Sequence, residues 1–358
     1  MKLGIVGLPN VGKTTLFNAL TCSHAETGSY SNAAVKPNIG QAKVPDPRLD
    51  WLAEYYHPKK YTPATIEFVD VVGIKKGSGR GNAYLQTIRQ VDALVHVVRC
   101  FENDEIFLEE ADARRDAETL NLELILADIE LVERRLEKAK KNAKGGDKKY
   151  RREAEMCEAL LEHLSDGKPA AKFPFTEEDR DILQDGGLLT VKPVIYAANL
   201  GEDDMTDYES NANYAALKEL AEAEGAAVLP VAAKFEEDIA GMEPDEAKDF
   251  MQEFGLTERG LDRLIRTSYH LLGYISFLTA GEDDVHAWTI VRGTKAPKAA
   301  GKVHTDIERG FIKADVVAFE DLKACGTMAA AKEKGLVRSE GKEYVMQDGD
   351  ITNFKFNV

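Results

Sequence analysis

The sequence predicts an α/β protein built on a doubly wound, largely parallel sheet, with an inserted helical hairpin and a small α+β domain. Short apolar strands alternate with helical stretches over residues 1–105 and again over residues 190–274. A heptad pattern occupies part of residues 106–189, and short strand-like pieces separated by turns fill residues 275–358. A chain of 358 residues has room for these two or three domains.

The composition is that of an ordinary soluble globular protein, with 44% hydrophobic and 30% charged residues. A net charge of −16 argues against non-specific coating of nucleic acid or anionic membranes, although it allows a local basic patch. The four cysteines form no C-x-x-C pair, so they indicate neither a disulfide framework nor a zinc site. No signal-peptide segment precedes the first apolar strand, and no apolar run approaches the roughly 20 residues that span a bilayer. We therefore expect a cytoplasmic monomer without membrane contact.

Residues 7–14 fit the phosphate-loop motif G-x-x-x-x-G-K-[ST], with an apolar strand before them and a helix-like stretch after them. Glycines at this spacing let backbone amides turn onto phosphate oxygens, aided by the positive end of the helix dipole. We expect the Lys13 ammonium, as the catalytic residue, to bridge the terminal phosphates, and the Thr14 hydroxyl to bind Mg²⁺. The predicted phosphate-binding residues are Asn10, Val11, Gly12, Lys13, Thr14 and Thr15.

A second element, IEFVDVVG at residues 66–73, is an apolar strand that ends in D-x-x-G. Asp70 at the strand end can hold Mg²⁺ through water, and the Gly73 amide can contact the terminal phosphate. Paired with the phosphate loop, this element predicts a Mg²⁺-dependent nucleoside triphosphatase. Ile74 stands where a Ras-like switch carries a water-orienting glutamine. An aliphatic side chain cannot orient water, so we expect turnover to be slow or to depend on another group.

The stretch AANLGEDD at residues 197–204 follows an apolar strand and predicts a base pocket. A guanine-reading loop normally carries N-K-x-D, whereas Asn199, Leu200 and Glu202 stand here. Glu202 is one methylene longer than aspartate, which weakens paired recognition of guanine, and Leu200 offers an apolar contact to either purine. The alternative is a polar loop that binds no ligand. Further strands are predicted at residues 93–98, 194–198 and 227–233.

Apolar residues then recur with heptad spacing and predict an antiparallel two-helix coiled coil. They fall at positions 122, 125, 129, 132, 136 and 139 on the first helix, and at 154, 157, 161 and 164 on the second. The hairpin tip is basic within an acidic chain, which suits contact with RNA phosphates, although a solvated helix end is the alternative. The basic residues of this tip are Lys138, Lys140, Lys141, Lys144, Lys148, Lys149, Arg151 and Arg152.

The last 84 residues are predicted to form a small α+β domain. They contain no acid–base pair or metal-ligand spacing, so we expect a binding module. The strand-like pieces lie at residues 285–291, 310–312, 316–319, 344–346 and 354–358.

Taken together, the motifs resemble those of the YchF/Obg-like ATPases, relatives of translation-factor P-loop GTPases. The matching stretches are GLPNVGKTTLFNALT (7–21), VPDPRLD (44–50), VDALVHVVRCFEN (91–103), AANLGE (197–202), FLTAGEDDVHAWTI (277–290), APKAAGKVHTDIERGFIKADVVAFEDL (296–322) and DGDITNFKFNV (348–358). The resemblance implies a P-loop domain, an inserted coiled coil and a C-terminal TGS domain, which is a β-grasp module. It also implies cytoplasmic Mg²⁺-dependent hydrolysis of ATP, weaker hydrolysis of GTP, and association with ribosomes through the coiled-coil tip or the TGS domain.

Two positions and the length of one loop depart from that family's pattern. Ala34 replaces a threonine that completes the Mg²⁺ shell, Leu108 replaces a histidine proposed to position water, and the loop after Gly73 is about four residues shorter. Two hypotheses remain open. One is a slow ATPase that acts as a nucleotide-dependent switch at the ribosome. The other is a nucleotide-gated ribosome- or RNA-binding adaptor with vestigial hydrolysis.

Overall fold

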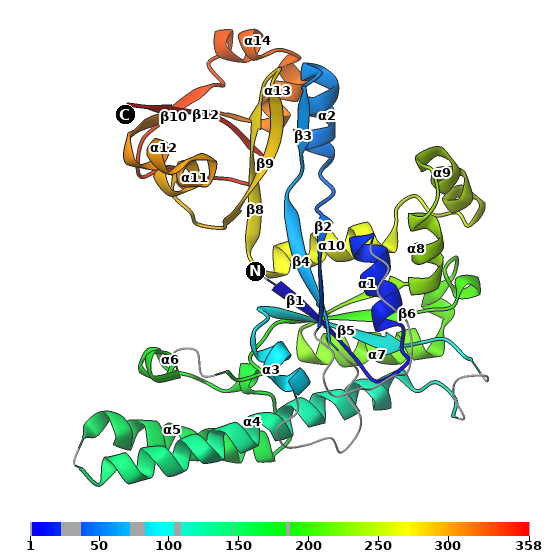
Figure 1. Cartoon of the computed structure of the whole chain (residues 1–358), viewed down its shortest axis with the longest axis vertical. Coiled ribbons are helices and arrows are strands. Elements are labelled where there is room, and N and C mark those ends of the chain that lie inside the picture. The colour runs from blue at the N-terminus through cyan, green and yellow to red at the C-terminus, as the bar shows by residue number, and fades with distance from the viewer. Residues whose placement is uncertain are drawn as a thin grey trace. The chain divides into compact units, whose positions relative to one another are not determined.

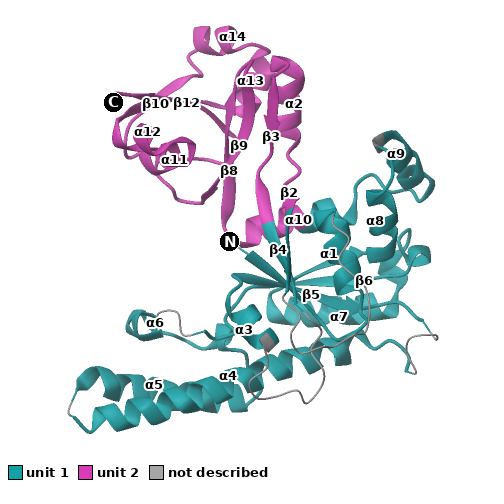
Figure 2. Cartoon of the chain, viewed as in Figure 1, with its two compact units in different colours: residues 1–41, 67–264 teal, residues 42–66, 265–358 magenta. Residues whose placement is uncertain are grey.

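The computed structural model of the chain divides into two compact units, residues 1–41 with 67–264 and residues 42–66 with 265–358 (Figure 2). The sequence prediction assigns residues 42–66 to the nucleotide-binding domain, whereas the structure groups them with the C-terminal unit. Among the described helices, none combines the length and apolar character needed to cross a bilayer. The described residues are 2–22, 37–71, 83–103, 109–145, 147–183 and 187–357.

A six-stranded sheet with mostly parallel pairing forms the centre of the first unit (Figure 1). In sheet order its strands are β2 (Asn38–Lys43), β4 (Thr65–Asp70), β1 (Lys2–Val6), β5 (Ala93–Arg99), β6 (Val194–Asn199) and β7 (Ala227–Val231). The pairs from β4 through β7 are all parallel. This order confirms the predicted doubly wound sheet. In such a sheet, helices connect successive parallel strands, so that all of these strands run in the same direction. Strand β2 was not predicted.

Helices cover both faces of this sheet, with α1 and α8 on one side and α3, α4 and α7 on the other (Figure 1). The α-helices of this part of the chain are α1 (Lys13–Thr21), α3 (Ala83–Arg89), α4 (Ala113–Ala143), α5 (Lys148–Ser165), α6 (Glu177–Leu183), α7 (Ala212–Glu224), α8 (Ala233–Ala240), α9 (Pro244–Glu253) and α10 (Gly260–Leu271). The 3-10 helices are η1 (Ala170–Lys172), η2 (Glu202–Asp204) and η3 (Tyr208–Ser210).

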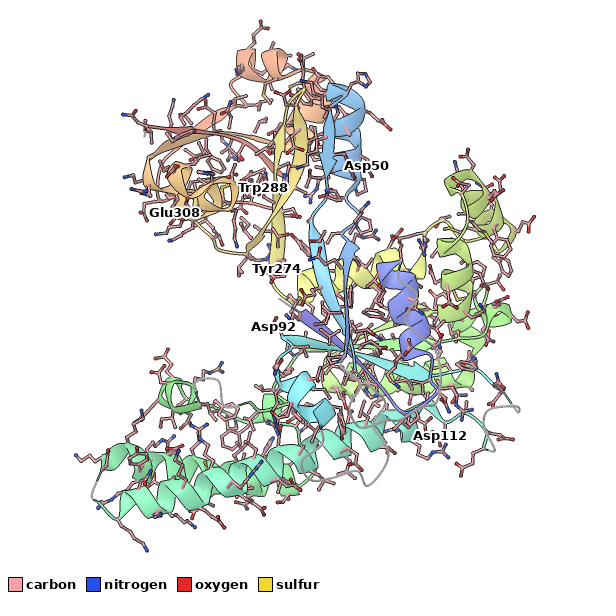
Figure 3. The ribbon with its side chains drawn as sticks, viewed as in Figure 1. Asp50, Asp92, Asp112, Tyr274, Trp288 and Glu308 are labelled. Carbon is pink, nitrogen blue, oxygen red and sulfur yellow. The ribbon has the colours of Figure 1, made fainter. Side chains whose placement is uncertain are left out.

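Helices α4 and α5 form the predicted coiled-coil hairpin. The Asp112 side chain (Figure 3) begins α4 by accepting a hydrogen bond from the Arg115 amide. Leu122 is an exception to the predicted seam, because 52% of it is exposed. The first turns of α4 pack on the sheet through Leu120, and position 122 lies about 200° further round the helix. Five other residues of the predicted seam are buried: Ile125, Val132, Ala139, Cys157 and Leu164. Four are only partly buried: Ile129, Leu136, Ala154 and Leu161. Met156 and Leu160, which were not predicted, are buried in the same hairpin core.

The second unit has a six-stranded sheet of its own. In order, its strands are β11 (Arg338–Glu340), β10 (Phe311–Ala318), β12 (Asp350–Phe356), β8 (Tyr274–Ala280), β9 (Asp284–Val291) and β3 (Lys60–Thr62). The unit has the predicted β-grasp arrangement. The antiparallel β8–β9 hairpin is followed by α11 (Ala296–Val303), by β10 and by β12, which pairs with β8 in parallel. The core on the α11 side includes Phe277, Trp288 (Figure 3) and Phe354. The remaining helices are α12 (Thr305–Arg309), α13 (Phe319–Cys325) and α14 (Met328–Glu333).

Three details of the predicted C-terminal strands differ from the structure. The two pieces at residues 310–312 and 316–319 are parts of one strand, β10, in which a register irregularity separates Phe311 from Lys313. The piece at residues 344–346 contributes only an isolated bridge between Val345 and Lys295. Strand β8 was missed, because its apolar residues pack on both faces of the sheet and leave no clear alternation.

Residues 42–66 join the second unit because they cover one face and one edge of its sheet. Helix α2 (Pro47–Tyr56) buries Leu49 and Leu52 completely, and the Trp51 ring meets Phe319 edge-on at 5.6 Å. Strand β3 pairs with β9 in parallel. Arg48 also makes a 3.0 Å ion pair with Asp348. These long-range contacts carry no local sequence signal, which explains why the prediction assigned the segment by chain order alone.

Candidate nucleotide-binding site

The phosphate loop joins the end of β1 to the start of α1 at the carboxyl edge of the parallel strands. Two glycines permit its close packing. A Cβ atom on Gly7 would lie 2.5 Å from the Val97 carbonyl oxygen, and one on Gly12 would lie 2.4 Å from the Asn199 side-chain nitrogen. Gly12 also has a φ of +94°, a left-handed conformation that favours glycine. The motif glycines are therefore required by the surrounding structure.

Lys13, the first residue of α1, is buried, with only 6% of it exposed. Its Nζ donates a 2.6 Å hydrogen bond to the Leu8 carbonyl oxygen within the loop. Burial lowers the pKa of Lys13 from 10.5 to about 8, and nearby Asp70 offsets part of this shift. A buried ammonium group at a helix N-terminus, beside backbone amides, is well suited to an anionic phosphate ligand.

Thr14 and Asp70 lie side by side, although 56 positions separate them in the sequence. The Thr14 Oγ1 donates a 2.9 Å hydrogen bond to Asp70 Oδ2, and the Asn38 Nδ2 lies 3.5 Å from the same oxygen. The other carboxylate oxygen, Asp70 Oδ1, is buried and has no hydrogen-bond partner among the described residues. Burial raises the pKa of Asp70, whereas Thr14, Lys13 and Asn38 act in the opposite direction.

These groups fit the implied Mg²⁺ ion. A hydroxyl and a carboxylate are hard oxygen donors, and a buried unpartnered carboxylate oxygen is free to accept a hydrogen bond from a metal-bound water. Within the described part of the chain, no group of three or more His, Cys, Asp or Glu side chains could enclose a metal.

Asn199 connects the predicted base loop to the phosphate loop. Its Nδ2 donates a 2.9 Å hydrogen bond to the Val11 carbonyl oxygen, and its Oδ1 accepts a 2.9 Å hydrogen bond from the Ala233 amide. The side chain is 5% exposed. The end of β6, the phosphate loop and the start of α8 are thus held together by one carboxamide.

The other two predicted base-pocket residues lie in different surroundings. Leu200 is only 4% exposed and belongs to a hydrophobic cluster with Tyr196 and Phe235, so its side chain faces the core. Its backbone amide donates to the Val231 carbonyl oxygen at 2.8 Å. Glu202 begins the exposed 3-10 helix η2. A base contact from Leu200 would therefore come from its backbone, unlike the predicted apolar side-chain contact.

Several predicted positions lie outside the described residues: Ala34, Gly73, Ile74 and Leu108. Two buried residues beside the site were not predicted. His96 on β5 lies 5.1 Å from the Tyr196 ring, and burial lowers its pKa to about 3, so it is neutral. Arg99, 2% exposed, donates to the carbonyl oxygens of Glu109 and Glu110. A signal for His96 was visible in the sequence, because a histidine inside an apolar strand is unusual. No comparable signal was present for Arg99.

The predicted basic tip is at the end of the α4–α5 hairpin, far along the chain from the phosphate loop. Seven of its eight cations are exposed, and Arg152 is partly buried against Asp179, with a 2.7 Å ion pair. Lys140 pairs with Glu158 at 2.7 Å. The exposed residues are Lys138, Lys140, Lys141, Lys144, Lys148, Lys149 and Arg151.

A glycine-bordered loop between the first strand of a parallel sheet and its helix, with the lysine and hydroxyl in place, defines a P-loop nucleoside triphosphatase domain. The chain is of this class. Two family models match it: MMR_HSR1, "50S ribosome-binding GTPase", over residues 2–132, and YchF-GTPase_C, "protein of unknown function", over residues 274–357. With the relatives described next, these matches show that the chain belongs to the YchF/Obg-like ATPase family.

Relatives match over the whole chain. It is 50% identical to the "Ribosome-binding ATPase YchF" of Bacillus subtilis, covering 100% of both chains, and 45% identical to that of Escherichia coli O157:H7, covering 100% of this chain and 99% of the other. The "Obg-like ATPase 1" of Oryza sativa subsp. japonica is 42% identical, covering 100% of this chain and 92% of the other. The solved structure of the Schizosaccharomyces pombe YchF GTPase is 35% identical, with a TM-score of 0.87, covering 99% of this chain and 97% of that one.

Proposed function

We propose that the chain binds ATP with Mg²⁺, and GTP less well, hydrolyses the bound nucleotide slowly and acts as a nucleotide-dependent switch at the ribosome. The observation that carries this proposal is the buried Lys13 ammonium in the phosphate loop, which donates a hydrogen bond to the Leu8 carbonyl oxygen. A nucleotide phosphate would add negative charge beside this buried ammonium.

Each polar group of the site has a role in this proposal. The backbone amides of residues 10–15 and the Lys13 ammonium hold the phosphates, and Lys13 stabilises negative charge on the terminal phosphate. The Thr14 hydroxyl and, through water, the Asp70 carboxylate hold the metal, with the Gly73 amide contacting the terminal phosphate. When bound, Mg²⁺ supplies positive charge to the phosphate oxygens.

Base recognition is proposed for the loop that begins at Asn199. The buried carboxamide positions this loop against the phosphate loop through Val11 and Ala233. Leu200 contributes backbone groups, because its side chain is in the core. Glu202 lacks the aspartate geometry that pairs with the two guanine donors, which supports a preference for adenine.

Association with ribosomes is supported by two features. Relatives over the whole chain are named "Ribosome-binding ATPase YchF". The exposed lysines of the coiled-coil tip also offer a surface for RNA phosphates, and the C-terminal β-grasp unit is a second candidate contact. We propose that the protein acts as a monomer in the cytoplasm.

A second candidate function is an adaptor that binds nucleotide and a ribosome or RNA but hydrolyses almost nothing. The sequence favours it at three positions, because Ala34, Ile74 and Leu108 lack the polar groups that would complete the metal shell or position water. Under this alternative, Lys13 and Thr14 still bind ATP, so binding and turnover have to be measured separately.

Hydrolysis of ATP and GTP by the wild-type protein and by Lys13→Ala tests the enzymatic function. We expect slow, Lys13-dependent ATP turnover that exceeds GTP turnover. The adaptor would be favoured if the wild-type protein binds ATP with micromolar affinity but neither protein hydrolyses it above background. Equal, negligible turnover without any nucleotide binding would remove both functions.

Co-sedimentation with ribosomes tests the partner. We expect nucleotide-dependent binding that weakens when Lys141, Lys144 and Lys148 are changed to glutamate. The matched control changes three exposed lysines away from the tip, Lys168, Lys172 and Lys248, to glutamate, and should bind as the wild type does. Binding that ignores both the nucleotide and the tip would contradict the switch.

A further inference from the structure

Asn38 is the first residue of β2 and reaches across to Asp70 on the neighbouring strand β4. Its Nδ2 lies 3.5 Å from Asp70 Oδ2, the oxygen that also accepts the 2.9 Å hydrogen bond from Thr14. Two donors, one from α1 and one from β2, therefore converge on one carboxylate oxygen. The second oxygen, Oδ1, has no partner among the described residues.

The position of β2 next to the site is fixed by close packing. A Cβ atom on Gly40 would lie 2.5 Å from Thr21 Cγ2 and 2.7 Å from Thr21 Cβ. The Thr21 hydroxyl in turn donates a 2.7 Å hydrogen bond to the Phe17 carbonyl oxygen within α1. Strand β2 is thus seated against the last turn of α1, which holds Asn38 at the metal side of the site.

We infer that Asn38 is a positioning residue for the Mg²⁺ site, acting through Asp70. With Oδ2 held by Thr14 and Asn38, the Asp70 carboxylate has a defined rotation that presents Oδ1 to a metal-bound water. The inference rests on the proposed nucleotide and Mg²⁺ binding, and it names a residue that determines how strongly Mg²⁺ adds to nucleotide affinity. The side chain of Ala34, in the same stretch of sequence, has no oxygen or nitrogen for this task.

Charge and exposure agree with this role. The Asn38 carboxamide is neutral, so it can donate to Asp70 without competing with the cation for the carboxylate charge. It is also exposed, so its contact with Asp70 is not a by-product of burial in the core. Because Asn38 contacts Asp70 Oδ2, its loss should weaken the orientation of Asp70 and leave the phosphate loop unchanged.

The test compares Asn38→Leu with Gln41→Leu. Both changes replace an exposed amide on β2 with leucine, but residues 38 and 41 point to opposite faces of the strand. Calorimetry measures ATP affinity with excess Mg²⁺ and again with EDTA, and Mn²⁺ electron paramagnetic resonance reports metal affinity of the ATP complex. These readouts do not depend on turnover.

We expect Asn38→Leu to weaken metal affinity of the ATP complex about 3- to 10-fold, the effect of losing one hydrogen bond to a charged group near the surface. ATP affinity in EDTA should stay at the wild-type value, and Gln41→Leu should match wild type in both conditions. Wild-type metal affinity in Asn38→Leu would overturn the inference, and so would an equal loss of affinity in EDTA. If the wild-type protein binds no ATP, the proposed function itself fails, which is a separate outcome.

Discussion

The Asn199 side-chain amide donates a 2.9 Å hydrogen bond to the Val11 carbonyl oxygen, across 188 positions of sequence. Because Asn199 Oδ1 also accepts from the Ala233 amide, one buried carboxamide sets the spacing between the phosphate loop and the proposed base loop. The phosphate loop and the proposed base loop are therefore joined through this one side chain.

Replacing Asn199 with alanine should weaken binding of ATP and GTP alike. The change leaves the Val11 carbonyl and the Ala233 amide buried without their partner, at a cost of about 1–3 kcal/mol in stability. Asp147→Ala is the control, because Asp147 caps α5 in the coiled-coil hairpin by accepting a hydrogen bond from the Lys149 amide. Both variants should melt earlier, but only Asn199→Ala should lose nucleotide affinity in calorimetry. Equal affinities in the two variants would contradict the coupling.

Gly12→Ala should abolish nucleotide binding. The new Cβ atom would lie 2.4 Å from Asn199 Nδ2, and the residue has a φ of +94°. Gly225→Ala separates backbone strain from the clash, because Gly225 has a φ of +74° and nothing within 4 Å of the added Cβ. We expect Gly225→Ala to lose about 1 kcal/mol of stability and to bind ATP normally. Normal ATP binding by Gly12→Ala would show that this contact is not required.

ATP affinity should fall as the pH rises through about 8. Burial lowers the pKa of Lys13 from 10.5 to about 8, and bound phosphate favours the protonated form, so binding takes up a proton above that pH. In the unliganded protein, the pH dependence of folding stability has the opposite sign to that of ATP affinity. The unfolded chain holds the Lys13 proton more tightly, so this group makes folding more favourable as the pH rises from about 8 to 10.5.

Calorimetry in buffers of different ionisation enthalpy measures the proton uptake directly. Lys13→Arg is the control, because a guanidinium stays charged throughout this range. Its residual ATP affinity should not change with pH in this window. A flat wild-type profile between pH 7 and 9.5 would contradict the role assigned to Lys13.

Leu52→Ala should destabilise the second unit by about 2–5 kcal/mol, as expected for a large cavity under α2. Hydrogen exchange should show the loss in β8 and β9, because α2 packs on their sheet, while nucleotide affinity stays unchanged. Glu54→Ala, an exposed change on the same helix, should stay within about 0.5 kcal/mol of wild type. Unchanged exchange in β8 and β9 would show that residues 42–66 do not support this unit.

The phosphate loop, Asp70 and the parallel strands could be predicted from sequence because their signals are local. A loop motif of eight residues is recognisable beside an apolar strand, and a heptad pattern needs only its own helix. The heptad prediction was wrong at Leu122, where α4 still packs on the sheet and not on α5. It also missed Met156 and Leu160, which are buried in the hairpin core. Local patterns thus predicted most of the first unit.

Relationships between distant residues could not be predicted in the same way. The Asn199–Val11 hydrogen bond, the Asn38–Asp70 contact and the packing of α2 on the C-terminal sheet all depend on tertiary structure. Leu200 illustrates the limit, because its position in the loop motif indicated a ligand contact whereas its side chain completes the core. Only packing distinguishes these two roles for an apolar residue.

Calorimetric titration with ATP, GTP and their non-hydrolysable analogues in the presence of Mg²⁺, on wild type and Lys13→Ala, tests the central claim most directly. We predict micromolar binding of ATP, weaker binding of GTP and loss of both in Lys13→Ala. Failure of the folded wild-type protein to bind either nucleotide would contradict the account, and so would wild-type affinity in Lys13→Ala.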